Sequence, residues 1–489
     1  MTSFALSTLW GCLMLLALRP CCSAELQPTV AAAPPRPPAA PFDVIVLGAG
    51  IAGLAAARNL SRAGLRVVVL EARNRTGGRL HSVDTASGHR VDLGAMWVHG
   101  ARPGNPLYDM AGPLGLNVSR KQNYNSGAIF VPGSGGNRTR MLTYMGGGSR
   151  RGVAGASSPL AGKREAFCQL TLLNANVSEL STLRYGDAKT IPEDDVLLET
   201  GMDAFTDAFR TALDVRLNTV VTAITHDAAG VALTTADGAT FTSPHAIITL
   251  PLGVLKQQAA TLFQPPLPAA KMGAIDGMGM GVLDKVVLVF QEAWWPRSAD
   301  FVARELADLS GRWCVFLNYA AVFDAPILVA LHVAATARDI EAASDEAVVA
   351  EALEALRDMG PPGGVVPQPV QAFVTRWAAD PFSRGAYSFY ATGNASGIVD
   401  VLAEPVGRLL FAGEATSREP ATAHGAYDSG LREAARLMAT LQTLAPGGAA
   451  AGAIPAMAAP TSVAAPPIDA AGNVSAVPAA AAPLPAVAG

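Results

Sequence analysis

A glycine-rich turn between an apolar strand and a helix constrains this chain more than any other feature of its sequence. Residues 43–47 (DVIVL) form a continuous apolar run, typical of a central parallel strand that is covered on both faces. Residues 48–53 (GAGIAG) follow at once, and a helical pattern then continues to Gly64. A second strand over residues 66–70 ends in Glu71. This order of strand, turn, helix, strand and acid predicts a Rossmann-type unit that binds a dinucleotide.

The glycines and the acid each have a physical task at a dinucleotide. Gly48 allows the tight turn, Gly50 lets the backbone approach the pyrophosphate, and Gly53 lets the helix pack closely on the strand. The helix that begins around Ala52 presents free amides and a positive dipole end to the phosphates. Glu71, 18 residues after Gly53, is placed to accept hydrogen bonds from the adenosine ribose. The alternative is a glycine-rich turn without a ligand.

The residues after Glu71 distinguish a flavin from a nicotinamide dinucleotide. They read Ala-Arg73-Asn-Arg-Thr-Gly-Gly78-Arg79, and a double glycine followed by arginine can bring a backbone turn and a guanidinium to a pyrophosphate. Solvated loop charge is the alternative for Arg73 and Arg79. The run resembles the start of the FAD-dependent amine oxidase family, which includes monoamine oxidases, polyamine oxidases and lysine-specific histone demethylases. The resemblance extends over about residues 42–443.

This resemblance implies an α/β fold with two domains and FAD as the cofactor. A Rossmann-type FAD-binding domain would consist of residues 42–100, 205–265 and 400–443, and a discontinuous mixed α+β substrate-binding domain of residues 101–204 and 266–399. Within the latter, about residues 126–200 are short and rich in Gly, Ser and Arg where the family has cavity-lining helices. We therefore carry over no pocket residues from the family in that stretch.

One segment resembles the family backbone that runs along the flavin ring and opens into the substrate cavity. It covers residues 92–100 and places Met96 and Trp97 at the flavin. His99 would face the substrate, and a histidine in this phrase is similar to that of polyamine oxidases. A structural histidine with satisfied hydrogen bonds is the alternative.

Two further segments are typical of the family and would otherwise read as plain core. Residues 214–224 read as a short strand whose backbone meets the adenine at Val221. Residues 246–255 read as a buried strand that runs into a turn.

A lysine stands at the head of an apolar strand over residues 284–290 (DKVVLVF). Such a lysine is costly unless its ammonium reaches water or a partner. One reading is a strand-end lysine that extends its ammonium to solvent. In the family, the matching lysine holds a water against the flavin N5, so the resemblance implies a catalytic role for Lys285.

The C-terminal third supplies the remaining candidates. Residues 377–388 resemble the segment that provides an aromatic wall beside the flavin, with Tyr387 at the wall and a core aromatic as the alternative. Monoamine oxidases carry the cysteine that tethers FAD where this chain has Ala386, so we expect FAD to be bound non-covalently. Glu414 matches the residue at the ribityl and pyrophosphate region.

Thr422 and Ala423 open the final helix. Its positive dipole end would face the flavin N1–C2=O and stabilise the negative charge of the reduced ring. Some relatives place a second aromatic where Thr422 stands, so the resemblance implies one aromatic wall here rather than a cage. Residues 420–430 also resemble the histone demethylase branch closely.

The resemblance implies oxidation of an amine by hydride transfer from the carbon α to an unprotonated nitrogen, with dioxygen as final acceptor and an aldehyde, an amine and hydrogen peroxide as products. The first reading is a polyamine oxidase for spermine, spermidine or an acetylated derivative. The alternatives are a histone-demethylase-like enzyme, another flavin oxidase for amino acids or an apolar substrate, and a flavoprotein scaffold without turnover.

The ends of the chain indicate targeting rather than structure. Residues 4–18 are apolar but short of the roughly twenty residues of a spanning helix, and a small-residue cleavage site precedes Glu25. We therefore expect a signal peptide over residues 1–24 and a secretory, extracellular or lumenal location. A chloroplast or mitochondrial transit peptide and an uncleaved anchor are the alternatives. Residues 25–41 read as a Pro/Ala linker, and residues 444–489 as a disordered Ala/Pro-rich tail.

Composition excludes several classes. A net charge of −4 provides no basic field for nucleic acid, and 50% hydrophobic residues exclude disorder of the whole chain. Cys168 and Cys314, which would remain after leader removal, are too few for a disulfide framework or a cysteine zinc site, and they either pair or stay buried. Glycosylation sequons occur at Asn59, Asn74, Asn117, Asn137, Asn176, Asn394 and Asn473.

Overall fold

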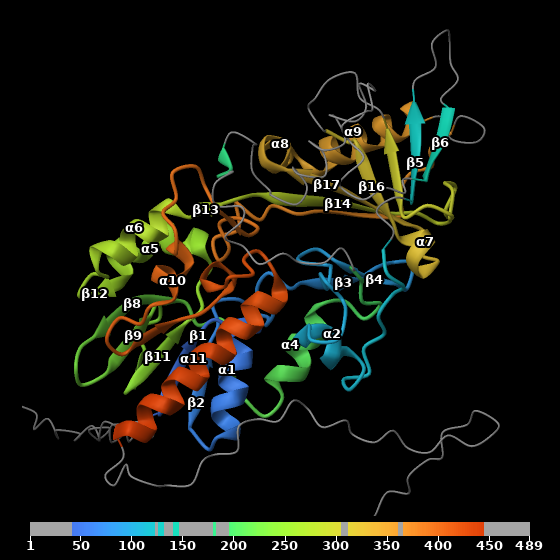
Figure 1. Ribbon diagram of the computed structural model, residues 1–489. Coiled ribbons are helices and arrows are strands. Elements are labelled where there is room, and N and C mark those ends of the chain that lie inside the picture. The colour runs from blue at the N-terminus through green and yellow to red at the C-terminus, as the bar shows by residue number, and fades with distance from the viewer. Residues whose placement is uncertain are drawn as a thin grey trace, which may run out of the picture. The chain divides into compact units, whose positions relative to one another are not determined.

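The computed structural model describes residues 42–122, 179–181, 195–304, 312–359 and 365–444, and the backbone of residues 126–131 and 140–145 (Figure 1). Several predictions fall outside these residues and stay predictions: the signal peptide with its localisation, the linker, the tail, Cys168 and the sequons at Asn137, Asn176 and Asn473. In the part of the chain that is described, no helix is both long and apolar enough to cross a membrane.

Five short parallel strands form the first sheet. In sheet order they are β20 (Leu409–Phe411), β11 (His245–Ile248), β1 (Val44–Leu47), β2 (Val67–Leu70) and β7 (Asp214–Arg216). Every neighbouring pair is parallel. All four residues of β1 are buried. The predicted central parallel strand is therefore confirmed.

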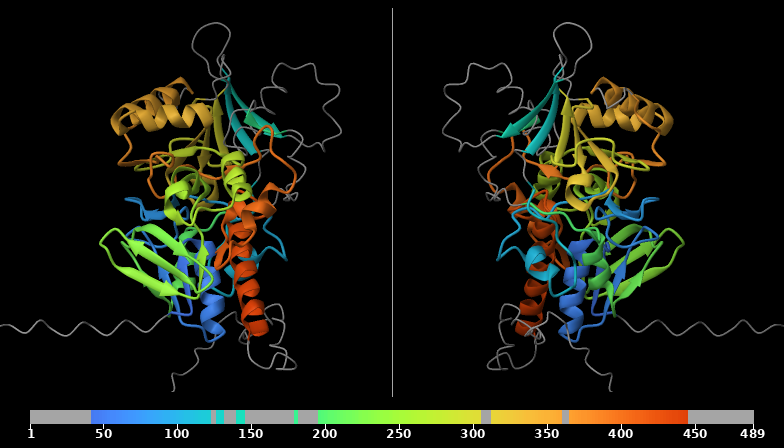
Figure 2. Two further views of the ribbon diagram at one scale, coloured as in Figure 1. Left: turned by 90° about the vertical axis from the view of Figure 1, so that its left-hand side faces the viewer. Right: turned by 90° about the vertical axis from the view of Figure 1, so that its right-hand side faces the viewer.

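The side chains of β1 alternate between two cores. Val44 and Val46 pack with residues of α1 (Ile51–Arg62), α4 (Asp203–Arg210) and α11 (Ala423–Leu444). Ile45 and Leu47 pack with the opposite core, which includes α5 (Leu252–Leu262), α6 (Ala269–Gly277) and α10 (Ile398–Ala403). Figure 2 shows α1 and α11 on one side of these strands and the small β8–β9 sheet on the other. Both faces are covered, as the continuous apolar run predicted.

The expectation of one strand over residues 214–224 is wrong. β7 ends at Arg216, and a second strand, β8 (Val221–His226), begins in another sheet. That four-stranded sheet has the order β10 (Thr240–Ser243), β9 (Val231–Thr235), β8 and β12 (Phe263–Gln264). Asn218 adopts φ +54°, which ends the first strand, and its N–H donates to Arg73 O at 2.8 Å. The turn therefore passes directly beside the segment that follows Glu71 and leads into Val221.

Residues 246–255 also differ from expectation at their end. The strand β11 is buried as predicted, but it runs into the helix α5 rather than into a turn alone. Pro251 takes the N-cap position, where its fixed φ of −56° suits a helix start and its missing N–H costs nothing. Gly253 and Leu255 therefore lie in the first turn of a helix.

A seven-stranded mixed sheet forms the second part of the fold. Its order is β18 (Gln371–Val374), β14 (Leu283–Val289), β17 (Ile327–Val333), β16 (Val315–Asn318), β15 (Phe301–Arg304), β5 (Ser126–Val131) and β6 (Arg140–Met145). The pairs are antiparallel except β15 with β5. The helices α8 (Ala334–Ala342) and α9 (Asp345–Asp358) supply the core of one face (Figure 1). The expected combination of a Rossmann-type domain and a mixed α+β domain is confirmed, and the domain boundaries stay a prediction.

His332 gives this second sheet a sensitivity to acid. Its side chain is 1% exposed, its ring lies edge-on to Trp313, and neither ring nitrogen has a hydrogen-bond partner among the described residues. Burial lowers the pKa of His332 from 6.5 to about 3. As pH falls, the unfolded state therefore takes up a proton at His332 before the folded state does. The stability contributed by the neutral ring is complete above pH 6.5 and decreases as pH falls towards 3.

We expect the wild-type protein to lose about 2 kcal/mol of stability through His332 between pH 7 and pH 5. A His332→Leu variant keeps the apolar contacts and cannot take up the proton. Thermal unfolding of both proteins at the two pH values measures the difference. Equal losses in wild type and variant would show that His332 is not the group responsible.

Candidate functional site

The site begins at the carboxyl ends of the parallel strands, where β1 turns into α1. Gly48 adopts φ +108°, a conformation that side chains other than glycine rarely take. A Cβ on Gly53 would lie 2.0 Å from Gly48 O, so the helix approaches the turn as closely as the motif predicted. Ala52 is similarly close to α11, since a Cβ on Gly430 would lie 2.1 Å from Ala52 O.

The start of α1 suits an anion. Its N-cap is Gly50, no side chain caps it, and its first turn holds no acidic residue. The backbone around it is open, because a Cβ on Gly50 would meet only Gly77 O, at 3.9 Å. Gly78, at φ +60°, lies just across from Gly50, with 3.6 Å between its potential Cβ and Gly50 Cα. Two facing glycine backbones at a helix start form a cradle that a pyrophosphate fits.

Glu71 lies at the end of β2, where a ribose acid is expected. Its side chain is buried, and it accepts hydrogen bonds from Ala49 N at 2.7 Å and Arg73 N at 2.9 Å. Each carboxylate oxygen has two lone pairs, so both can still accept from a ribose. The fit of a dinucleotide to the strand ends therefore rests on Glu71 and the glycine cradle together.

The arginines after Glu71 hold loops in place. Arg73 pairs with both carboxylate oxygens of Asp380 at 2.7 Å and donates to Ser383 Oγ at 2.9 Å. Arg75 donates to the carbonyls of Gly78 and Leu80, which stabilises the double-glycine turn. The solvated-charge reading of Arg73 is wrong, because its guanidinium connects the loop after Glu71 to the segment that leads to Tyr387. Its contact with a pyrophosphate stays a prediction.

Arg79 and Glu414 form the other bridge between these segments. Arg79 donates to Glu414 Oε1 at 2.8 Å and to Ala386 O at 2.9 Å. The second oxygen of Glu414 accepts from Ser388 Oγ at 2.5 Å and from Ala421 N at 3.0 Å. The buried Glu414 thus joins Arg79, the residues on both sides of Tyr387 and the start of α11.

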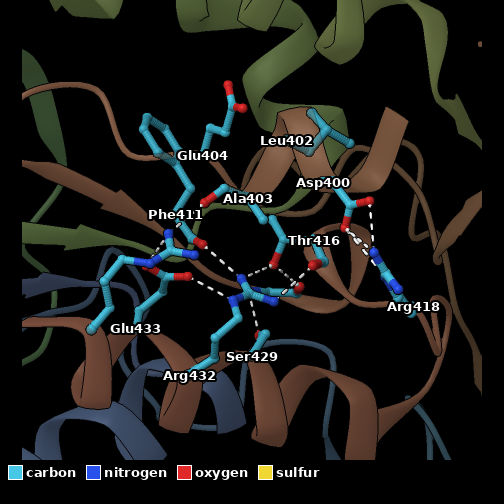
Figure 3. A network of polar contacts seen from close by, with 12 residues as sticks. Asp400, Leu402, Ala403, Glu404, Phe411, Thr416, Arg418, Ser429, Arg432 and Glu433 are labelled. Atoms are coloured by element: carbon cyan, nitrogen blue, oxygen red, sulfur yellow. Dashed lines mark hydrogen bonds and ion pairs between the residues drawn. The ribbon is translucent and has the colours of Figure 1, made fainter. Parts of the chain in front are cut away.

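An ion pair of α11 holds the turn that carries Glu414 (Figure 3). Arg432 donates to Thr416 O at 2.8 Å and to Phe411 O at 3.1 Å. Its Nε pairs at 2.6 Å with Glu433, whose side chain is fully buried. Arg432, paired with Glu433, therefore holds the turn from β20 into the 3₁₀ segment η5 (Glu414–Thr416). No sequence motif marked this ion pair.

A small pocket lies at this end of the sheet. Its polar lining residues are Arg79, Lys271, Glu414 and Thr416, and apolar residues of β11, β20, α5, α6 and α10 line much of the rest. A Cβ on Gly413, which adopts φ +122°, would meet no atom within 4 Å, so the backbone there is open as well.

His99 has a partner that sequence analysis missed. His99 Nδ1 lies 2.9 Å from Asp195 Oδ2, and Gly100 N donates to Asp195 Oδ1 at 3.1 Å. Trp97 is close to the His99 ring and donates to Gln122 Oε1 at 2.9 Å. Asp195 and Gln122 belong to no motif, so no sequence signal marked them. Met96 is buried in the neighbouring core, where its contact with a cofactor stays a prediction.

Lys285 is buried rather than exposed, so the solvent-reaching alternative is wrong. Its side chain is 2% exposed, and Nζ donates to Asp92 O at 2.8 Å and to Gly94 O at 2.5 Å. Burial lowers the pKa of Lys285, and the nearby Asp92 carboxylate opposes this. An ammonium has three donors, so one remains beyond the two carbonyls. The arrangement is suited to holding a water beside the 92–94 loop.

Tyr387 and Thr422 are each adjacent in sequence to a residue that bonds to Glu414: Ser388 and Ala421. Tyr387 packs against the core below β14, and burial raises its pKa well above the usual value, so its phenol stays neutral. Thr422 Oγ1 accepts from Gly425 N at 2.9 Å and so caps α11, which begins at Ala423 as predicted. Arg79 and Glu414 connect the segments that carry Tyr387 and Thr422. Trp377 connects the first of these segments to the 92–94 loop at Lys285, because its Nε1 donates to Leu93 O at 3.1 Å.

Comparison with known proteins found matches to both the sequence and the fold of this chain. A family model described as flavin containing amine oxidoreductase matches residues 51–169 and 162–438. Polyamine oxidase 2 of Arabidopsis thaliana is 34% identical over 433 residues, which cover 80% of this chain and 87% of that protein. Lysine-specific histone demethylase 1 homolog 2 of Oryza sativa subsp. japonica is 34% identical over 450 residues, 82% of this chain and 58% of that protein. Wild-type putrescine oxidase bound to putrescine superposes with a TM-score of 0.66 at 21% identity, over 82% of this chain and 99% of that one, and shares the fold.

Proposed function

The chain belongs to the flavin-containing amine oxidoreductase family, and within that family we propose that it is a polyamine oxidase with a non-covalently bound flavin. The observation that carries this proposal is that a polyamine oxidase matches at 34% identity over 87% of its own length, whereas a histone demethylase of equal identity matches over 58% of its length. Amine oxidation itself follows from the family. The choice of a polyamine as substrate, dioxygen as acceptor and peroxide as product belongs to the proposal.

The bound flavin supplies the two-electron acceptor for the carbon–nitrogen bond of the amine. The glycine cradle, Glu71 and Glu414 would hold its dinucleotide part. Lys285 keeps an ammonium donor at the 92–94 loop, and Tyr387 offers an aromatic face on which a substrate carbon can rest. The amine must be unprotonated to react, and the apolar surroundings of Tyr387 favour that form because they disfavour charge. This chain's own residues therefore contribute to the reaction by positioning the amine and by removing it from water.

A buried carboxylate, that of Asp195, supports a cationic substrate. Asp195 is 5% exposed and bonds to His99 and to the Gly100 backbone. A polyamine carries several ammonium groups, and a carboxylate beside the substrate-side histidine attracts the one that is not oxidised. A simple monoamine has no such second charge. The pair His99–Asp195 thus favours a polyamine over a monoamine.

The proposal is tested by peroxide release from the full-length holoenzyme. We expect turnover with spermine, spermidine or N-acetylated spermine, and an Asp195→Asn variant is expected to raise KM for that polyamine about tenfold, the value of roughly 1.4 kcal/mol of lost attraction. KM for a monoamine serves as the matched control and should not change. Acid precipitation should release the flavin into the supernatant. Peroxide from a methylated-lysine peptide or a monoamine, with none from any polyamine, would replace this proposal.

A further inference from the structure

Asp284 is a fully buried carboxyl beside the candidate catalytic lysine. It precedes Lys285 on β14, so the two side chains point to opposite faces of the strand. Its Oδ1 accepts from Thr375 Oγ1 at 2.8 Å and from Trp377 N at 3.0 Å. Its Oδ2 is buried and has no hydrogen-bond partner among the described residues. An ionised carboxylate with one unpaired oxygen is poorly accommodated in such a place.

A second carboxyl continues the same pattern of contacts. Glu341, on α8, accepts from Ala378 N at 2.6 Å and from Ala379 N at 3.0 Å. Three consecutive backbone N–H groups, from Trp377 to Ala379, therefore end on two neighbouring carboxyls. Burial, and then the Glu341 carboxylate, raise the pKa of Asp284 to about 8. A proton on Asp284 removes the repulsion between the two groups and gives Oδ2 a donor role towards Glu341.

The other charged groups around Asp284 do not provide an alternative counter-charge. His332 is its register partner on β17, and it is neutral because burial lowers its pKa. Arg376, which follows β18, donates to the carbonyls of Glu341 and Ala343 and pairs with Asp345. Glu341 is the group that faces it from α8. Because none of these groups is a cation paired with Asp284, protonation is the way in which its buried Oδ2 gains a hydrogen-bond partner.

The contacts of Asp284 lead to both sides of the candidate site. Thr375 Oγ1 also accepts from Lys285 N, at 2.8 Å. Trp377 donates through Nε1 to Leu93 O, between the two carbonyls that hold the Lys285 ammonium. The segment that begins at Trp377 continues through Asp380, the partner of Arg73, to Tyr387. Asp284 therefore bonds to Thr375, whose hydroxyl holds the Lys285 backbone, and to Trp377, where the segment that leads to Tyr387 begins.

We infer that Asp284 is a positioning residue that works in its protonated form, donating a hydrogen bond to Glu341, and that this carboxyl pair sets the places of Lys285 and of the segment 377–387 for amine oxidation. Above the pKa of Asp284 the two carboxylates repel each other and the segment loosens. Oxidation then declines on the alkaline side for a reason that lies in the enzyme rather than in the substrate amine. The inference rests on the amine oxidase activity of the family and not on the choice of a polyamine.

Two substitutions separate positioning from simple folding. Asp284→Asn keeps the acceptor for Trp377 and supplies a permanent donor for Glu341, so we expect flavin reduction by spermine at pH 7 within about threefold of wild type, with the decline above pH 8 removed. Asp284→Ala leaves the three N–H groups with one carboxyl, and we expect a loss of tenfold or more in the same rate while flavin is retained. A rate lost equally in the Asn and Ala variants would overturn the inference.

A spectroscopic reading tests the proton directly and needs no substrate. The infrared difference spectrum of wild-type holoenzyme minus Asp284→Asn at pH 7 should contain the C=O stretch of a protonated carboxylic acid, and this band should disappear as pH rises past about 8. Asp300→Asn is the matched control, because Asp300 is equally buried but pairs with Arg120, so its difference spectrum should contain carboxylate bands only. Absence of the protonated band from the Asp284 spectrum would overturn the inference. If spermine fails to reduce the flavin at all, the proposed substrate falls while the band still decides the state of Asp284.

Discussion

Replacing Lys285 by methionine is expected to slow flavin reduction by about a hundredfold or more in a protein that still folds and still carries flavin. Methionine fills a similar volume but donates no hydrogen bond, so the carbonyls of Asp92 and Gly94 lose their partner and no donor remains for a water. The loss should appear in the rate of anaerobic flavin reduction at saturating substrate, which reports the chemical step rather than binding.

Lys256→Met provides the matched control for this substitution. Lys256 is a half-buried lysine on α5 whose Nζ donates to the carbonyl of Asp276, away from the 92–94 loop. Its replacement removes a comparable lysine–carbonyl bond and should leave the reduction rate within about twofold. A Lys285→Met enzyme with a wild-type reduction rate would show that the buried ammonium serves the fold alone.

Gly53→Ala is expected to abolish flavin binding. The added Cβ would lie 2.0 Å from Gly48 O and 3.1 Å from Thr249 Oγ1, and a backbone oxygen cannot move away without shifting the turn between β1 and α1. Overpacking in a rigid place costs about 1–3 kcal/mol and more where backbone must shift, so we expect the upper end of that range or beyond. The flavin content of the purified protein, from its visible absorbance, and the thermal unfolding midpoint measure the two consequences.

The same substitution at Gly273 tests whether the effect comes from crowding. Gly273 lies in the helix α6, and a Cβ there would meet no atom within 4 Å. Alanine is about 1 kcal/mol more favourable than glycine inside a helix, so Gly273→Ala should keep its flavin and unfold at the same or a higher temperature. Full flavin content in Gly53→Ala would contradict the assignment of this turn to the dinucleotide.

The sequence predicted those parts of the site whose partners lie close together along the chain. The strand, the three glycines and Glu71 fall within residues 43–71, so one local pattern contains the whole turn and its acid. Lys285 was marked by its cost in an apolar strand, although the carbonyls that satisfy it lie 191 and 193 residues away. A costly residue type can thus be recognised before its partner is known.

The remaining features depend on contacts that no local pattern contains. The Arg73–Asp380 pair spans 307 residues and the His99–Asp195 pair 96, and each partner is an ordinary charged residue in its own segment. Asp284 and Glu341 meet only because α8 packs against β14. The strand error over residues 214–224 has a local cause, since β-branched residues on both sides concealed the turn at Asn218.

The most direct test of this account is anaerobic mixing of the full-length holoenzyme with spermine, spermidine, N-acetylated spermine and a simple monoamine in turn, followed through the visible flavin absorbance. The account predicts that at least one polyamine bleaches the flavin, faster than the monoamine does, and that Lys285→Met slows this bleaching. A flavin that stays yellow with every polyamine, but is bleached by the monoamine, would contradict it.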